Sequence, residues 1–163
     1  MDLELINIAL NGVSFIMNTY FQFKGQRTEE VKASVTINKV FINHNSCAMN
    51  ISITNNTAKP FSIIKLFMQH GELVYDVCRI INVVPINTNS GNRNFTLGTD
   101  LEKYQYENVH SEGFSIESFN IHAYLLENQA ETGWVVFKIP KEHMVINKIG
   151  IKISSTDEVL YAD

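Results

Sequence analysis

The first long apolar stretch of the chain runs from Leu5 to Phe23 and contains no charged residue. On a helical wheel, where successive residues are 100° apart, its polar positions fall within one arc about 80° wide. We call these positions, with the preceding glutamate, the polar stripe: Glu4, Asn7, Asn11, Ser14, Asn18 and Gln22. Most of the remaining circumference is apolar, whereas an ordinary surface helix has a narrow apolar stripe. The pattern therefore predicts one N-terminal α-helix over residues 3–23 that is buried on most of its sides.

The two ends of this segment also fit a helix. The acidic residues before it and Lys24 after it match the helix dipole, and Gly25 can terminate the helix. With a rise of 1.5 Å per residue the helix would be about 30–34 Å long, close to the thickness of a bilayer's hydrocarbon core. We expect residues 1–25 to form this segment, residues 26–33 to form a charged linker, and residues 34–163 to form the main domain.

Three environments could bury such a helix, and the sequence leaves all three open. The helix could span a membrane, in which case Lys24, Arg27 and Lys32 would place the following domain in the cytoplasm. It could pack against sister chains in a water-soluble homo-oligomer through the polar stripe. It could also pack on its own domain, which would make the protein soluble and cytoplasmic. The acidic start and the lack of a small-residue cleavage site argue against a secretory signal peptide.

From Ser34 onward the apolar pattern changes to a period of two, which is typical of strands with one buried face. The clearest example is the run from Cys47 to Thr54, in which every second residue is a large apolar one or a cysteine. About seven to nine short strands of this kind are separated by turn residues and by no helical stretch. Parallel strands would require crossover helices. The pattern therefore predicts a mainly β domain, an antiparallel immunoglobulin-like β-sandwich.

Three pieces of this domain carry characteristic strand and turn patterns. They are Ile51–Asn56 with Pro60, Gly133–Pro140, and Ile149–Ile153. These pieces resemble the immunoglobulin-like domains of unknown function found in bacterial lipoproteins and in small bacterial proteins with a hydrophobic leader helix. The resemblance covers roughly residues 34–163. It implies a non-catalytic sandwich behind an anchoring segment and identifies no functional residues, and the chain lacks the lipid-accepting cysteine of the lipoproteins.

The stretch from Pro85 to Asp100 is the longest one without a strand pattern. A loop of this length is commonly functional or mobile. Arginine and aromatic side chains are frequent hot spots of interfaces, so Arg93 and Phe95 are candidate binding residues. Tyr104 and Tyr106, two residues apart on the next segment, are candidates as well. We expect these residues to contact a protein or a small ligand.

Composition and charge narrow the function further. The chain has 163 residues, of which 45% are hydrophobic and 18% charged, as in a folded globular protein. Its net charge of −4 argues against nucleic-acid binding, which usually requires a basic stripe. Cys47 and Cys78 both precede the single tryptophan, Trp134, which does not fit an immunoglobulin-type disulfide. We therefore expect two buried free thiols.

Residues that could carry catalysis or hold a metal are scattered along the chain. His44 and Cys47 form a His-x-x-Cys pair, but a zinc site needs further ligands, and Cys78 is the only obvious third. His110 has a serine and a glutamate beside it, but adjacency in sequence does not make a catalytic triad, and no nucleophile elbow accompanies it. We expect no enzyme activity, no metal and no cofactor.

Together these patterns predict a non-catalytic binding or scaffolding module, tethered by its helix to a membrane or to sister chains. The alternative is a soluble monomeric accessory protein whose helix packs on the sandwich, and a third possibility is a hydrolase on a β-sandwich. Deleting residues 1–25 separates the first two hypotheses, because an independent domain would stay folded without them.

Overall fold

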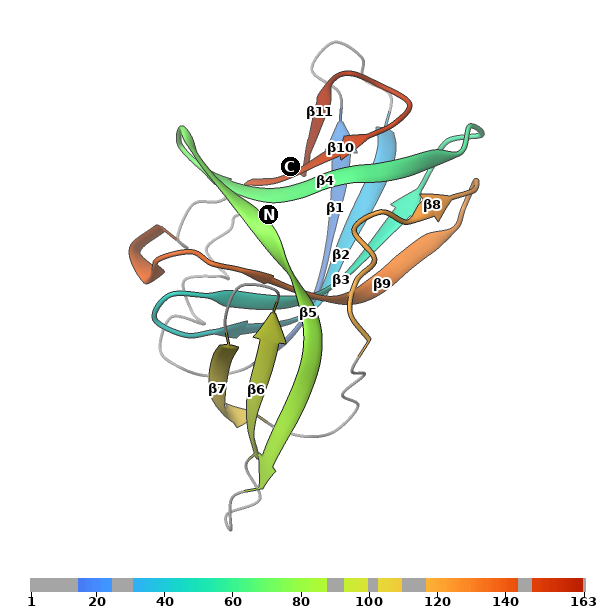
Figure 1. The fold of residues 1–163 in the computed structure, drawn as a ribbon. Coiled ribbons are helices and arrows are strands. Elements are labelled where there is room, and N and C mark those ends of the chain that lie inside the picture. The colour runs from blue at the N-terminus through green and yellow to red at the C-terminus, as the bar shows by residue number, and fades with distance from the viewer. Residues whose placement is uncertain are drawn as a thin grey trace.

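The computed structural model describes residues 15–24, 31–87, 93–99, 103–109, 117–143 and 148–162. Within them the fold is almost entirely antiparallel β-structure (Figure 1). The strands are β1 (Phe15–Lys24), β2 (Val31–Ile42), β3 (Cys47–Asn55), β4 (Phe61–His70), β5 (Leu73–Asn87), β6 (Arg93–Thr99), β7 (Lys103–Val109), β8 (Tyr124–Leu125), β9 (Ala130–Phe137), β10 (Lys148–Ile153) and β11 (Val159–Ala162). A short 3-10 helix, η1 (Lys141–His143), follows β9. The prediction of a mainly β, antiparallel fold is confirmed.

The strands form one curled sheet in the order β7-β6-β5-β9-β3-β2-β1-β11-β10-β4-β8. Residues 73–76 of β5 also pair with β4, next to the part of β5 that pairs with β9. Because of this extra pairing the strand order closes on itself, from β5 through β9, β3, β2, β1, β11, β10 and β4 back to β5. Residues 80–87 of β5 continue beyond this ring and pair with β6, which in turn pairs with β7. This β6–β7 hairpin lies at the bottom of the view in Figure 1.

The predicted N-terminal helix is wrong over the residues that the structure describes. Residues 15–24 form β1, which lies between β2 and β11. Asn18 and Gln22, the two stripe residues within β1, are four residues apart and so share a face in a strand as well as in a helix. This part of the polar stripe therefore did not discriminate between the two. Aromatic and β-branched residues are frequent in β1, and they favour strands. The other two asparagines of the stripe, Asn7 and Asn11, lie outside the described residues.

The domain boundaries change accordingly. β2 begins at Val31, so the end of the predicted linker, residues 26–33, belongs to the sheet. Residues 25–30 lie outside the described part of the chain. Among the residues that are described, no helix has the length and apolar character needed to cross a membrane. β1 pairs with β2 and β11, so it is a strand of the same sheet as the other strands.

The inner face of the curled sheet carries the main core. Alternate residues of β3, β9 and β10 face it and are almost fully buried. They include Met49, Ile51, Ile53, Val135, Phe137, Ile149, Ile151 and Ile153. Phe119, Ala123 and Leu125, from the segment before β9, complete this core. The period of two in the sequence is therefore the alternation between the inner and the outer face.

A second apolar cluster lies on the outer face of the sheet. Phe41, Ala48, Val136 and Cys78 occupy one cross-strand row over β2, β3, β9 and β5. Trp134 lies in the same cluster, and its ring stacks on Phe41 with centroids 5.1 Å apart and planes 15° apart. β3 and β9 are thus buried on both faces at this point. This explains why β9 contains an unbroken apolar run, from the tryptophan to its last phenylalanine.

The two cysteines lie on opposite faces of the sheet. Cys47 packs in the inner core and Cys78 in the outer cluster. Both are buried and free of disulfides. The prediction of two buried free thiols is confirmed.

Burial raises the pKa of the Cys47 thiol to about 12. The unfolded chain ionises this thiol near its ordinary value of 9.0, so at higher pH the unfolded state has lost a proton that the folded state keeps. The free energy of unfolding should therefore fall, by roughly 1 kcal/mol per pH unit from this one group, as pH rises from about 9 towards 12. We expect Cys47→Ala to show a flatter alkaline slope than the native chain in urea unfolding. Identical slopes for the two proteins would contradict this expectation.

The segment around Phe119 packs directly against β9. Phe119 N donates to Trp134 O at 3.0 Å, and Trp134 N donates to Glu117 O at 2.8 Å. Gly133 allows this approach, because a Cβ at that position would lie 2.6 Å from Phe119 Cα. β9 pairs with β5 over only a short length, and the segment around Phe119 adds further hydrogen bonds along β9. The same segment places Phe119 in the core.

A buried asparagine joins the end of β3 to two neighbouring loops. Asn55 is 0% exposed, and its Nδ2 donates to the carbonyl oxygens of Lys59 at 3.0 Å and Leu125 at 3.1 Å. Its Oδ1 accepts hydrogen bonds from the backbone N and the hydroxyl of Thr57, both at 2.8 Å. Its backbone N and O bond to the loop that follows β8. This one side chain therefore fixes the turn at residues 56–60 and the end of β8.

Candidate functional site

The turn between β4 and β5 exposes two apolar side chains. Gly71 and Glu72 form a two-residue loop, and His70 pairs with Leu73 across it. Gly71 has a φ of 59°, which suits glycine at the first position of a tight hairpin. Leu73 and Val74, which follow the loop, are each 50% exposed. A tight turn thus holds two large apolar side chains in contact with solvent.

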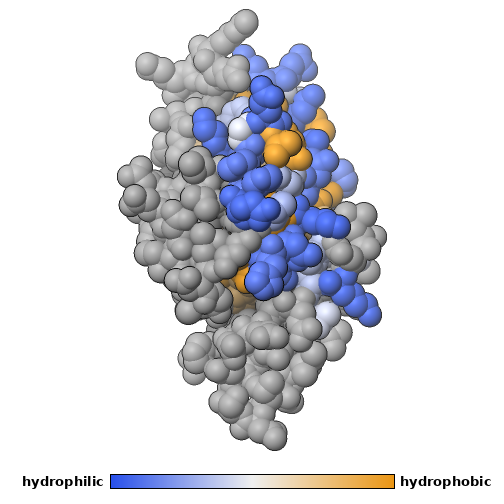
Figure 2. All heavy atoms as spheres, turned by 90° about the vertical axis from the view of Figure 1, so that its left-hand side faces the viewer, coloured by the Kyte–Doolittle hydropathy of each residue, from blue (hydrophilic) through white to orange (hydrophobic). Residues whose placement is uncertain are grey.

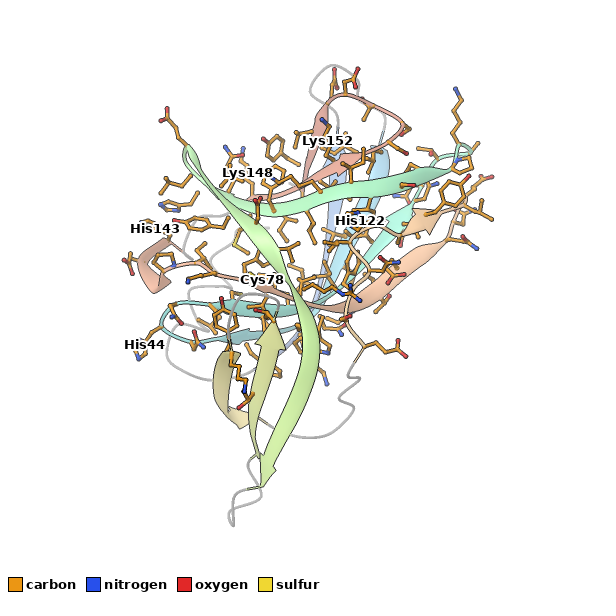
Figure 3. The ribbon with its side chains drawn as sticks, in the orientation of Figure 1. His44, Cys78, His122, His143, Lys148 and Lys152 are labelled. Atoms are coloured by element: carbon orange, nitrogen blue, oxygen red, sulfur yellow. The ribbon has the colours of Figure 1, made fainter. Side chains whose placement is uncertain are left out.

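The helix η1 places a histidine against this hairpin. His143 N donates to Pro140 O at 2.9 Å, which forms the single turn of η1. The imidazole of His143 stacks on that of His70, with centroids 4.7 Å apart and planes 9° apart. Its Nδ1 is hydrogen-bonded to the hydroxyl of Tyr75, and the imidazole tautomer sets which atom donates. Figure 3 shows His143 on η1, beside the β4–β5 hairpin.

We call these residues together the hairpin rim: His70, Leu73, Val74, Tyr75 and His143. The two histidines and the tyrosine are half-buried, and the stack and the hydrogen bond fix their rings. The side of the molecule that holds the hairpin rim faces the viewer in Figure 2, where small apolar patches interrupt a mostly hydrophilic surface. Such a surface can form apolar contacts, stack on rings and exchange hydrogen bonds through imidazole nitrogen.

The stretch that the sequence suggested as a long loop is mostly β-structure. Residues 85–87 belong to β5, and residues 93–99 form β6. Residues 88–92 lie outside the described residues. The hydrogen bonds between paired strands are made by backbone groups, so asparagine and threonine can form them as well as valine can. A polar stretch can therefore be a strand even though its sequence shows no alternation of apolar residues.

Three of the four predicted binding residues come together on the β6–β7 hairpin. Phe95 of β6 pairs directly with Tyr106 of β7, and Arg93 lies two positions from Phe95 along β6. Tyr104 is different, because it is 2% exposed and packs in the outer apolar cluster. Its expected exposure to a partner is therefore corrected: Tyr104 is a core residue.

The sequence did not reveal the hairpin rim. Tyr75 and His143 are 68 positions apart in the chain, and no local pattern links them. The one local signal was Gly71 at the end of an apolar run. His44, which the sequence singled out, lies exposed in the turn before Cys47. Among the described residues, no three His, Cys, Asp or Glu side chains are close enough together to hold a metal ion.

Comparisons with known proteins identify no family and no function for this chain. No protein-family model matches the sequence, and no curated protein is similar to it in sequence. Among solved structures, the fold is similar to the crystal structure of a functionally unknown protein from Listeria monocytogenes EGD-e. The TM-score is 0.36 and the sequence identity 13%, over 100% of this chain and 92% of the other.

Proposed function

We propose that this chain is a non-catalytic binding module that contacts a protein partner through the hairpin rim. The observation that carries the proposal is the 50% exposure of Leu73 and Val74 at this hairpin. Leu73 lies on the same face as the fixed rings of His70 and Tyr75, and Val74 lies on the opposite face. Exposed apolar side chains next to ordered rings are typical of the centres of protein interfaces. Because His143 is held by His70 and Tyr75, binding would order few additional side chains and would lose little conformational entropy.

Two finer parts of the proposal come from the sequence patterns. The alternation of buried and less buried positions in the antiparallel strands supports an immunoglobulin-like sandwich as the finer description of the curled sheet. The register of Phe95 opposite Tyr106 supports a second contact surface on the β6–β7 hairpin, with Arg93 beside it.

Site-specific photocrosslinking tests the main contact. We expect a photoreactive p-benzoylphenylalanine at Val74 to give one discrete crosslinked protein in the cells that naturally express this chain. Tyr75→Phe should lower the yield about three- to tenfold, because it removes one hydrogen bond that orients His143 and keeps the ring of residue 75. Crosslinked bands resolved by mass spectrometry give the yield.

The matched control carries the photoreactive residue at Ser155, which lies exposed in the turn between β10 and β11. It should give no product of the same mass. The same product from both positions, or no product from Val74, would contradict the proposed function.

A further inference from the structure

Lysines gather on the outer face of the sheet next to the hairpin rim. The isoleucines of β10 fill the inner core, so the alternating residues Lys148, Gly150 and Lys152 lie on the outer face. In the register between β10 and β4, Lys152 pairs with Lys65 and Gly150 pairs with Phe67. We call Lys65, Lys148 and Lys152 the basic face. Figure 3 labels the two lysines of β10.

The positive charge of the basic face is only partly neutralised within the described part of the chain. Lys65 Nζ lies 2.8 Å from Asp76 Oδ1, with both side chains largely exposed. Lys148 and Lys152 form no ion pair with any described residue. Like charges directly opposite each other on paired strands are unfavourable, and the chain as a whole has a net charge of −4. The basic face is therefore a local exception to the overall charge, and it attracts anionic groups.

The basic face is continuous with the hairpin rim. Val74 pairs with Gln69, and Gln69 pairs with Lys148, so the three residues form one cross-strand row. Neighbouring strands are about 4.8 Å apart, which places the backbones of Val74 and Lys148 about 10 Å apart. Lys148 and Lys152 are four residues apart along β10, which corresponds to about 13 Å. Carboxylates at positions i and i+4 of an extended peptide have the same spacing.

Between these two lysines an aromatic side chain closes the outer face, and Phe67 is only 6% exposed. Gly150 has no side chain, and the ring of Phe67 lies over it, with Phe67 ring atom Cε1 2.9 Å from where a Cβ would be. Tyr161 meets the Phe67 ring edge-on, with centroids 6.2 Å apart. A segment along β10 would therefore contact mainly Lys148 and Lys152, since Phe67 exposes little of its ring.

We propose that the partner of the hairpin rim presents an extended acidic segment that lies along β10. This inference rests on the proposed function. An apolar residue of the segment contacts Val74, which shares the outer face with the lysines, and two carboxylates four residues apart reach Lys148 and Lys152. The partner chemistry is that of an acidic peptide, because the lysines adjoin exposed apolar side chains and the net charge of −4 opposes long polyanions.

Selection from a phage-displayed library of random dodecapeptides on the full-length chain tests the partner chemistry. We expect the selected sequences to be enriched in pairs of Asp or Glu four residues apart, next to a large apolar residue. Selected peptides should bind Lys148→Glu/Lys152→Glu about tenfold more weakly in fluorescence anisotropy. The charge-matched control, Lys59→Glu/Lys103→Glu, changes two exposed lysines elsewhere and should bind as the native chain does. Lys148→Gln/Lys152→Gln, which only removes charge, should lie between them and serves if the reversal fails to fold.

The outcomes separate the two proposals. Selected peptides without acidic enrichment, or equal weakening by both charge reversals, would overturn the acidic partner while the crosslink at Val74 stands. Loss of the Val74 crosslink would overturn the proposed function itself. A single-stranded oligothymidylate of twenty nucleotides is the competing probe. If it binds more tightly than the peptides and this binding requires Lys148 and Lys152, the face recognises phosphate and the acidic peptide is wrong.

Discussion

Deleting residues 1–24 is expected to abolish the cooperative thermal unfolding of the chain. β1 lies between β2 and β11, so its removal exposes the backbone edges of both strands and opens the ring of pairings. It would also leave Val35, Ile37 and Leu160, now at most 1% exposed, next to the gap. A domain with roughly 5–15 kcal/mol of total stability does not survive the loss of a central strand. Circular dichroism and calorimetry of the full-length and truncated chains provide the measurement.

A truncated chain that melts in one sharp transition would contradict this expectation and would support the hypothesis of an N-terminal helix outside the main domain.

A disulfide test checks the register of β1 and β2 independently. Tyr20 pairs with Thr36, so Tyr20→Cys/Thr36→Cys should oxidise to an intramolecular bond, because opposite residues in an antiparallel pair have Cα atoms within disulfide range. The control Phe21→Cys/Thr36→Cys places the first cysteine on the other face of β1 and should stay reduced. Cys47 and Cys78 form no disulfide, so they add the same two thiols to the count of every variant in denaturant.

Strands with one buried face could be predicted from the sequence. The run that begins at Cys47 was expected to alternate, and it forms β3 with the period of two intact on the inner face. The piece Ile149–Ile153 also carried a strand pattern, and it lies within β10, which pairs with β11. These elements were predictable because the large apolar residues of the inner face recur at every second position, even though β3 is also covered on its outer face near Ala48.

Elements whose environment depends on distant partners could not be predicted. β1 is apolar because of its position inside a closed sheet, and the sequence shows only an apolar stretch whose four-residue spacing also fits a helix. β6 is stabilised by backbone pairing with β5 and β7, so its polar sequence resembles a loop. In both β1 and β6 the strand conformation is set by pairing with neighbouring strands and not by local sequence propensity.

The candidate site was even less accessible from sequence. The hairpin rim combines the β4–β5 turn with a histidine from η1, and only the closure of the sheet brings them together. The exposure of Leu73 and Val74 is equally invisible in a strand that also contains buried residues. Asn55 shows the same limit, because the sequence predicted a turn after it but could not show that its side chain builds the turn.

Asn55→Ala is expected to lower the free energy of unfolding by about 2–4 kcal/mol. The alanine removes the hydrogen bonds to Lys59, Leu125 and Thr57, and it leaves the Leu125 carbonyl without its side-chain donor in a buried place. The neighbouring Asn56 is exposed, so Asn56→Ala is the matched control and should change stability by less than about 0.5 kcal/mol. Urea unfolding of the three proteins at one pH gives the comparison.

Asn55→Asp sharpens the test because it keeps the shape of the side chain and changes only the donors. The carboxylate cannot donate to the Lys59 and Leu125 carbonyls, and burying its charge is costly, so at neutral pH it should destabilise more than alanine does. The folded state then favours the protonated acid, which raises the carboxyl pKa above its unfolded value. The stability that protonation provides is fully present below the pKa of the unfolded chain, about 3.9, and is lost as pH rises from there through the raised pKa of the folded chain, so the Asp variant should approach the Ala variant only in acid. A stability difference between the two variants that is the same at pH 4 and pH 8 would mean that Asn55 does not donate to buried carbonyls.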